Sequence, residues 1–520
     1  MKKFEKIQIV KNIGSSWFAL GINVLVGIFL SPYILHRLGD EAFGLWVLIF
    51  SVTGYYGLFD LGIRSSIIRY VAKYSATDDS FELNRLVNTA ILSYSCIGLV
   101  VMAITFAASF YVGSIFRIPA EFLATARLLF LLVGSAVALG FPLGVFGGIL
   151  EGLQRFYLLN STSIGSTLIR AVLIVIALRH GKGLLTVALV TVSLPIVSGL
   201  VNATIVFFIS PIRLGIRYFD RSSLRRMANY GGTTFIIIVA TKLRFKSDAV
   251  VIGTFLSSAA ITYFTIGSRL VDYASEVVSS MAQIFVPMSS RSEATGDMHS
   301  LRKMFVAGNR ACALIIFPIA AILAILGKSV IEAWVGARYV AVSYPVLLIL
   351  LVPSTLMLAQ SASGRILFGM AKHRTWAWVV LGEGVSNLIL SIALVRHFGI
   401  IGDAVGTALP LLFTQLFFLP HHLCRLLKIH LSSYLRHAFS LPLALTAPLV
   451  ATLILLRYWF VPHNYIQLGI HLLVGLAVYG LGLLWAVSTG KAWRVEGLVL
   501  RDGVQVEPAQ VYVEASKSEV

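Results

Sequence analysis

The chain has 520 residues, of which 58% are hydrophobic and only 12% are charged, and its mean hydropathy is +0.86. Soluble domains carry roughly 25% charged residues because their surfaces face water. This composition therefore excludes a soluble globule and predicts that most apolar side chains face lipid. The net charge of +19 is not gathered on a solvated domain, as it is in nucleic-acid-binding proteins, so we expect no nucleic-acid partner.

Fourteen apolar runs follow one another along the chain, near residues 13–36, 43–63, 86–112, 121–148, 157–178, 184–209, 230–254, 258–287, 305–326, 341–368, 375–395, 401–420, 437–459 and 465–488. Each can cross a bilayer as a helix of about 20 residues. The run after the N-terminal lysines is too long for the core of a signal peptide, so we expect it to remain as the first span. The predicted fold is an all-α integral membrane protein with about 14 transmembrane helices.

Lysine and arginine indicate which loops face the cytoplasm, because short loops rich in these residues stay on that side. With the N-terminus inside, the cytoplasmic segments hold most of the basic residues, including those at 210–229 and 421–436. The opposite segments hold few. The sequence therefore predicts that both termini are cytoplasmic.

One stretch of sequence recurs in the second half of the chain. Gly152, Arg179-His180-Gly181 and Pro195 have counterparts at Gly369, Arg396-His397 with Gly399, and Pro410. Corresponding helices then point the same way, as in transporters built from parallel repeats; chance similarity between apolar helices is the alternative. We expect an N-terminal six-helix lobe at 1–209, a linker at 210–229, a C-terminal six-helix lobe at 230–420, two peripheral helices at 421–488 and a cytoplasmic tail at 489–520.

The linker carries basic residues at a helical spacing. Pro211 can start a helix there. Steps of four residues then place four arginines on one face: Arg213, Arg217, Arg221 and Arg225. Such a basic helix would lie on the cytoplasmic surface and contact anionic membrane lipids. The alternative is ordinary cytoplasmic charge without lipid preference.

Ionisable residues inside membrane spans are costly unless they are paired or hydrated, so each one is a functional candidate. In the seventh run Lys242 and Lys246 share one helix face, and Arg244 and Asp248 share nearly the opposite face. This spacing predicts a local ion pair between Arg244 and Asp248. The two lysines have no local partner, and we expect them to line a water-filled cavity that receives an anion.

The eighth run carries one polar stripe along its helix, made of Thr265, Arg269, Asp272, Glu276, Ser280 and Gln283. Such a stripe must face a cavity or another helix rather than lipid. We assign Arg269 to the anion site. Adjacent carboxylates in a low dielectric disfavour double ionisation, so we assign Asp272, Glu276 and Asp248 to ion coupling. A self-neutralised contact between helices is the alternative.

Several weaker signals remain along the spans. Arg170 stands alone in the fifth run and joins the candidates for the anion cavity. Four more polar residues are candidates for lining the cavity: Asn23, Asp60, Glu383 and Asn387. Gly140, Gly144 and Gly148 recur at steps of four, a spacing that favours close helix contact. Each of these signals has ordinary helix packing as its alternative.

Motifs for several chemistries are missing from the sequence. There is no Walker loop and no H-E-x-x-H motif. The three cysteines, Cys96, Cys312 and Cys424, have neither disulfide nor metal-ligand spacing. His421, His422 and His430 lie in a basic loop without thiol or carboxylate neighbours. We expect no metal site, no cofactor and no enzymatic activity.

Three groups of residues resemble motifs of bacterial polysaccharide transporters. They are Leu38-Gly39 with Phe43-Gly44-Leu45-Trp46; Asp248 with Val251-Ile252-Gly253; and Gly364-Arg365 with Gly369, Glu383, Asn387, Gly399-Ile400, Gly402 and Gly406-Thr407. Together they make the chain similar to oligosaccharide-lipid flippases of the polysaccharide transporter family, and the resemblance spans roughly residues 10–425. That family belongs to a superfamily that includes multidrug extruders and the lipid II flippase. Asp403 departs from the family pattern, which usually has a small residue at this position.

The resemblance implies two six-helix lobes around a central cavity, with two peripheral C-terminal helices, in the bacterial cytoplasmic membrane. It also implies ion-coupled alternating access that moves an undecaprenyl-diphosphate-linked oligosaccharide outward, as a unit of O-antigen, capsule or exopolysaccharide. An envelope polysaccharide polymerase complex would be a further partner. The cationic residues within the spans agree with a diphosphate-bearing substrate.

Three other functions remain open from the sequence. A cation-coupled multidrug extruder of the same superfamily would favour acidic over basic cavity residues. A membrane-embedded polymerase or glycosyltransferase would need catalytic carboxylates at an extracytoplasmic mouth. A scaffold for an envelope synthesis complex would tolerate loss of every charge in the cavity.

Overall fold

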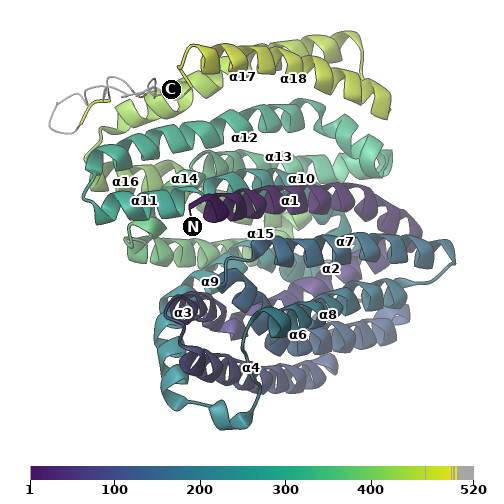
Figure 1. Cartoon of the computed structure of the whole chain (residues 1–520). Coiled ribbons are helices and arrows are strands. Elements are labelled where there is room, and N and C mark those ends of the chain that lie inside the picture. Colours follow the sequence, from purple (N-terminus) through teal and green to yellow (C-terminus); the bar gives the residue numbers. More distant parts are fainter. Residues whose placement is uncertain (1, 463, 493–494, 496–497, 501–520) are drawn as a thin grey trace. The chain divides into compact units, whose positions relative to one another are not determined.

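The computed structural model describes residues 2–462, 464–492, 495 and 498–500, and Figure 1 shows its helices in chain order. Most of the tail expected at 489–520 lies outside these residues. The described chain consists of helices joined by short turns, with an isolated β-bridge between Ile429 and Leu500. Helices suit these long apolar runs because, in lipid, every backbone N–H and C=O group must be satisfied within the segment.

The helices up to the middle of the chain are α1 (Lys2–Leu38), α2 (Asp40–Gly54), α3 (Ile63–Ala76), α4 (Ser80–Ser109), α5 (Val112–Ile115), α6 (Leu123–Gly152), α7 (Phe156–Arg179), α8 (Leu184–Ile209) and α9 (Arg221–Phe255). The later helices are α10 (Ser258–Ala282), α11 (Phe285–Ala294), α12 (Met298–Val335), α13 (Val340–Ala359), α14 (Ser361–Gly369), α15 (Arg374–Phe413), α16 (Leu419–Leu426), α17 (Leu431–Trp459) and α18 (Tyr465–Ser488). A 3-10 turn at Tyr55–Asp60 extends α2, and a π-helical turn at Thr414–Phe418 joins α15 to α16.

The predicted class, an all-α multi-pass membrane protein, is confirmed. Among the described residues, 11 helices are long and apolar enough to cross a membrane. Large apolar side chains on their outer faces are exposed, for example Leu99 of α4 at 72% and Phe208 of α8 at 86%, as lipid-facing residues are. The helices α9 and α10 fall outside this group because of their charged residues. The count of fourteen spans stays a prediction.

The helix α15 is a hairpin rather than one straight helix. Its backbone turns at Gly399, where φ is 59° and ψ is −142°, a conformation that favours glycine. A Cβ atom on Gly406 would lie 2.5 Å from the backbone nitrogen of Ser391, so the two arms lie against each other. The break expected near 396–401 therefore separates two antiparallel helices.

Contacts divide the chain into two compact units. The first comprises Met1–Glu276, Ile331–Leu350 and Ala377–Pro410, and the second comprises Val277–Val330, Leu351–Trp376 and Leu411–Val520. In the first unit α6 packs between α4 and α8, α1 packs on α7, and α2 packs on α9. In the second unit α11 packs on α14, and α17 packs on α18. The division into lobes at 1–209 and 230–420 stays a prediction.

The internal repeat appears in the backbone turns. Three pairs of corresponding residues have left-handed φ angles: Asp78 and Gly296 (55° and 69°), Gln154 and Ala371 (55° and 55°), and Gly181 and Gly399 (69° and 59°). The residue after the first pair caps the following helix in both halves, because Asp79 accepts a hydrogen bond from the Glu82 N–H and Asp297 accepts one from the Ser300 N–H.

Close helix contacts repeat as well. A Cβ atom on Gly152 would meet Ile68 and Val71 of α3, within the first unit. Its counterpart Gly369 would meet Val286 and Ser289 of α11, within the second unit. Turns, a helix cap and a close helix contact thus match at corresponding positions of the two halves, which supports the repeat predicted from sequence landmarks.

The linker between α8 and α9 differs from the helix expected at 210–229. It is non-helical except for one 3-10 turn at Ile216–Tyr218, and α9 begins at Arg221. Two asparagines of α4 form hydrogen bonds with backbone groups of the linker instead. The side chain of Asn84 accepts a hydrogen bond from the Arg213 N–H at 2.6 Å, and Asn88 accepts one from the Gly215 N–H at 2.8 Å and donates one to the Arg213 carbonyl at 2.8 Å. Because α4 satisfies these groups, the linker needs no helix.

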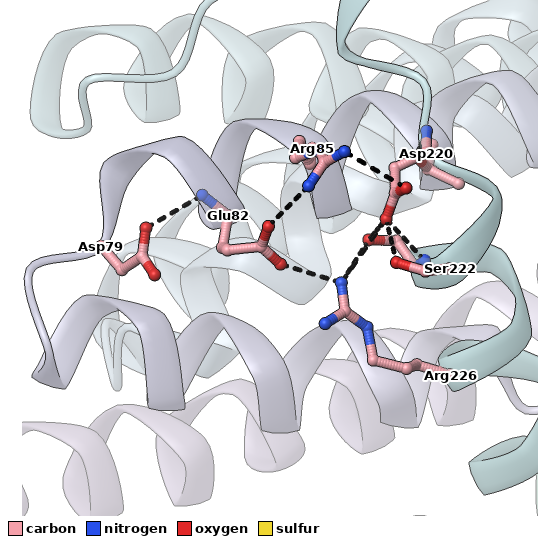
Figure 2. A network of polar contacts seen from close by, with 8 residues as sticks. Asp79, Glu82, Arg85, Asp220, Ser222 and Arg226 are labelled. Carbon is pink, nitrogen blue, oxygen red and sulfur yellow. Dashed lines mark hydrogen bonds and ion pairs between the residues drawn. The ribbon is translucent and has the colours of Figure 1, made fainter.

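A charged network, defined here as Glu82, Arg85, Asp220 and Arg226, joins α4 to the start of α9 (Figure 2). Glu82 binds Arg85 at 3.0 Å and Arg226 at 2.8 Å, while Asp220 lies 3.4 Å from Arg85 and 3.6 Å from Arg226. Asp220 also caps α9: hydrogen bonds from the hydroxyl of Ser222 and from the hydroxyl and N–H of Ser223 hold its pKa well below the usual value. The linker is therefore fixed to α4 by both backbone and side-chain contacts.

Candidate functional site

A cavity of about 330 Å³, called here the charged cavity, lies within the first unit. Six helices supply its walls: α1, α2, α7, α8, α9 and α10. Aromatic rings of α2 line one side, among them Trp46 and Phe50. Its charged lining residues are Arg170, Lys246, Asp248, Arg269 and Asp272.

Three of the four residues predicted for the anion site, Arg170, Lys246 and Arg269, therefore line one cavity. Lys242 does not line it. Its ammonium group instead lies 3.6 Å from the position that a Cβ atom on Gly57 would take. The two lysines were predicted to share one helix face. They lie one turn apart on α9, and their side chains have different surroundings: Lys246 lines the charged cavity, whereas Lys242 lies near Gly57.

The cations of the charged cavity are only weakly neutralised. Arg269 lies 4.0 Å from Asp272, at the limit of an ion pair. Arg170 and Lys246 make no ion pair within the described part of the chain. Glu276, assigned to ion coupling with Asp272, is exposed and does not line the cavity. The lining of the cavity thus carries three positive and two negative side chains, so positive charge is in excess.

Buried polar residues form a second group beside the charged cavity, where α9 meets the hairpin α15. Arg244 does not take Asp248 as its partner, as the spacing predicted; its Nε lies 2.7 Å from Oε1 of Glu383, and both side chains are buried. Asp248 instead accepts a hydrogen bond from the Thr407 hydroxyl at 2.9 Å. The prediction of a local pair was wrong because each residue finds a partner on α15, which the sequence of α9 alone does not reveal.

The same group continues across α15 and is named here the oxygen cluster: Asp248, Asn387, Ser391, Asp403 and Thr407. Oδ1 of Asn387 accepts hydrogen bonds from Ser391 at 3.0 Å and from Thr407 at 3.2 Å. Asp403 is fully buried, and neither of its carboxylate oxygens has a hydrogen-bond partner among the described residues. This carboxylate lies close enough to Asp248 for their charges to interact.

Asp403 was not among the residues predicted for the site. Its departure from the family pattern was the one feature of the sequence that could have indicated it. A buried carboxylate (Asp403) and a half-buried one (Asp248), close to amide and hydroxyl oxygens, can take up a cation or share a proton. Within the described residues, no three His, Cys, Asp or Glu side chains meet as a metal site.

A second cavity of about 810 Å³, called here the hydroxyl cavity, also lies within the first unit, among helices α1, α2, α3, α4, α6, α7 and α8. Asn23 and Asp60, both predicted to line a cavity, contribute to its wall, whereas Glu383 and Asn387 line neither cavity. Tyr94 donates a hydrogen bond to Asp60. Asn23 accepts one from Thr167 at 3.0 Å and so joins α1 to α7.

Two of the three glycines of α6 that were predicted to favour helix contact line this cavity instead. A Cβ atom on Gly140 or Gly144 would meet no atom within 4 Å, whereas one on Gly148 would lie 3.2 Å from Ile67. Both Gly140 and Gly144 line the hydroxyl cavity. Of the three glycines predicted to favour close packing, only Gly148 makes such a contact.

Comparison with known proteins shows a match between this chain and one protein family. Residues 9–293 match the family described as "Polysaccharide biosynthesis protein". The chain is 22% identical over 438 residues to the "Uncharacterized membrane protein EpsK" of Bacillus subtilis, covering 82% of this chain and 84% of that protein. It is 20% identical over 414 residues to the "Putative O-antigen transporter" of Shigella flexneri, covering 79% of this chain and 96% of that protein.

Solved structures share the fold at low sequence identity. The lipid II flippase MurJ in an inward closed conformation superposes with a TM-score of 0.71 and 15% identity, covering 94% of this chain and 100% of MurJ. An inward-facing multidrug resistance MATE family transporter of the MOP superfamily superposes with a TM-score of 0.66 and 14% identity, covering 79% of this chain and 94% of that protein.

Proposed function

Because this chain belongs to the polysaccharide biosynthesis protein family, we propose that it is a transporter that flips a lipid-linked oligosaccharide across the bacterial cytoplasmic membrane. The observation that carries the proposal is the charged cavity, in which Arg170, Lys246 and Arg269 line a space between membrane helices. Ionisable groups at such depth are costly and mark substrate pathways.

The charge of this cavity suits a diphosphate. Arg170 comes from α7, Lys246 from α9 and Arg269 from α10, so the three cations approach from different helices. Charge-assisted hydrogen bonds to phosphate oxygens are shorter and stronger than neutral ones. An undecaprenyl-diphosphate carrier presents such oxygens between its lipid tail and its sugar. The names of the relatives, a flippase of lipid II and an O-antigen transporter, support a lipid-linked substrate.

The oxygen cluster supports ion coupling. A cation or proton bound between Asp248 and Asp403 neutralises two neighbouring carboxylates, which are costly to hold together in ionised form. Both Thr407 and Asn387 of α15 bond to α9: Thr407 donates to the Asp248 carboxylate and Asn387 donates to the Arg244 carbonyl. The occupancy of the cluster would therefore influence how α9 packs on α15. Alternating access driven by a gradient of sodium ions or protons follows from such a link.

Further parts of the proposal concern orientation and surroundings. The linker arginines Arg213, Arg217, Arg221 and Arg225 are exposed directly after the α8 span, where cytoplasmic basic residues contact anionic lipid headgroups. Both termini would then be cytoplasmic. An envelope polysaccharide polymerase would receive the flipped substrate on the other side.

The test is reconstitution of the purified protein in vesicles that contain undecaprenyl-diphosphate-linked oligosaccharide in one leaflet. A membrane-impermeant glycosidase measures the amount of sugar that reaches the other leaflet. We expect the wild-type protein to move the glycan and the double variant Arg170→Ala/Lys246→Ala to lose this activity, because each lost phosphate contact contributes about 1.5–3 kcal/mol.

The matched control is Lys11→Ala, which removes an exposed cation outside both cavities. It should transport at the wild-type rate. Equal transport by the double variant and the control would show that the charged cavity does not bind the substrate. Efflux of a cationic dye without glycan movement would favour the multidrug extruder, whose fold this chain shares.

A further inference from the structure

The hydroxyl cavity owes its width to missing side chains. Gly54 of α2 and Gly140 and Gly144 of α6 line it, and a Cβ atom on any of them would meet no atom within 4 Å. Elsewhere in the same unit glycines permit close helix contact: a Cβ atom on Gly98 would lie 2.6 Å from the Ala138 carbonyl oxygen. Gly54, Gly140 and Gly144 therefore keep a space open, whereas Gly199, which also lines the cavity, permits a close contact with Leu143.

The polar groups of this cavity are mostly neutral. Thr162 donates a hydrogen bond to Asn202 at 2.9 Å, and both line the cavity. The hydroxyls of three further lining residues make no hydrogen bond to protein in the described chain: Ser163, Ser166 and Ser198. Hydroxyl and amide groups can both donate and accept, so this wall matches a ligand that carries many hydroxyl groups and little charge.

The charged residues at the edge of the cavity are already partnered. Arg64 binds Glu151 at 2.6 Å, and Asp60 accepts a hydrogen bond from Tyr94. Arg170 is different, because it makes no ion pair among the described residues and lines both cavities. Phe50 and Thr191 also line both. The hydroxyl cavity and the charged cavity therefore adjoin, with Arg170 at their boundary.

We propose that the hydroxyl cavity binds the carbohydrate of the transported lipid, while the charged cavity binds its diphosphate. This inference rests on the proposed function and adds a site to it. The volume of about 810 Å³ lies within the range of 300–1,000 Å³ common for ligand sites, large enough for several sugar rings. Arg170 contacts the diphosphate at the point where the first sugar is attached, and Gly140 and Gly144 limit the size of glycan that is accepted.

The experiment compares two lipids in reconstituted vesicles: undecaprenyl diphosphate that carries one sugar, and the same carrier with a tetrasaccharide. The variant is Gly144→Val, whose Cβ atom would meet no protein atom within 4 Å. The added side chain occupies space that the longer glycan needs, so we expect transport of the tetrasaccharide lipid to fall by about 5–150-fold. Transport of the single-sugar lipid should stay within about twofold, because its diphosphate site is unchanged.

The matched control is Gly165→Val on α7. Its Cβ atom would also meet no atom within 4 Å, but it lines neither cavity, so both lipids should move at wild-type rates. Equal loss of both lipids by Gly144→Val, or loss of neither, would overturn the inference. A wild-type protein that moves neither lipid would instead refute the proposed function.

A second variant keeps the inference testable if Gly144→Val folds poorly. Gly144→Cys in a Cys96→Ser background places one accessible thiol in the cavity, because Cys312 and Cys424 are buried. Alkylation after folding with thiol reagents of increasing size should progressively block the tetrasaccharide lipid before the single-sugar lipid. Block of both lipids at the same reagent size would contradict the inference.

Discussion

Asp248 and Asp403 are neighbouring carboxylates, and it is costly to keep both ionised without a bound cation or proton between them. Replacement of Asp248 by Asn keeps the size of the side chain and its acceptor for Thr407, but removes one negative charge. We expect Asp248→Asn, and likewise Asp403→Asn, to reduce gradient-driven glycan accumulation by about 5–150-fold, the usual range for energetic coupling between sites. Transport down the substrate's own gradient should persist. The measurement is accumulation in vesicles with an imposed sodium or proton gradient.

The variant Glu276→Gln tests the assignment of Glu276 to ion coupling, which was made from the sequence alone. Glu276 is exposed and does not belong to the oxygen cluster. The variant should keep its gradient dependence. If Glu276→Gln loses coupling while Asp248→Asn retains it, the polar stripe of α10 carries the ion instead.

For individual residues, the sequence could predict which side chains line a cavity better than which partners they take. Arg170, Lys246, Arg269 and Asp272 were recognisable because charge inside a span is costly, and they do line one cavity. The partner of Arg244 was not predictable, because local spacing favours Asp248 whereas folding brings Glu383 of α15 within 2.7 Å. That Gly144 lines a cavity was not predictable for a similar reason. A glycine permits either a close helix contact or an open space, depending on which residues face it.

At the element scale, the linker between α8 and α9 offers a direct test of its attachment to α4. The double variant Asn84→Ala/Asn88→Ala leaves backbone groups of Arg213 and Gly215 without partners. Unmade hydrogen bonds of this kind cost about 1–3 kcal/mol each. We therefore expect trypsin to cleave after Arg213 and Arg217 at least about fivefold faster, since cleavage follows the population of the open segment.

The control on the same helix is Ser93→Ala, because the Ser93 hydroxyl bonds only to the backbone of α4. Cleavage in this variant should match the wild-type rate. Unchanged cleavage in the double asparagine variant would mean that the charged network of Glu82, Arg85, Asp220 and Arg226 holds the linker by itself.

The elements themselves were largely predictable, because apolar runs in lipid have little alternative to helix. The break at Gly399 and the repeat were visible in glycine and proline landmarks. The expected linker helix is absent because Asn84 and Asn88 form hydrogen bonds with the backbone groups of the linker. These tertiary contacts cannot be read from the spacing of the arginines. Propensity and pattern describe a segment in isolation, and here a neighbouring helix decides its conformation.

For the whole molecule, the side of the membrane on which each loop lies is the open question. The helix α17 has 29 residues and a length of about 44 Å, which exceeds a hydrocarbon core of about 30 Å. Residues 428 and 461, which flank it, should therefore lie on opposite sides. Membrane-impermeant maleimide should label a cysteine at 220, 297 or 428 only from the cytoplasmic side, and a cysteine at 461 only from the other side, in a Cys96→Ser background.

The decisive position is Asp297, because α9 and α10 both lie between it and the linker. The structural repeat argues that both helices cross: Asp297 caps its helix as Asp79 does, and the turn before it matches the turn at Asp78. In a parallel repeat, corresponding turns face the same side, so 297 should be cytoplasmic together with 79. The charges of α9 and α10 would then face the cavity rather than lipid. Labelling of 297 from outside would mean that one of these two helices does not span, and the proposed transport path through the charged cavity would have to be abandoned.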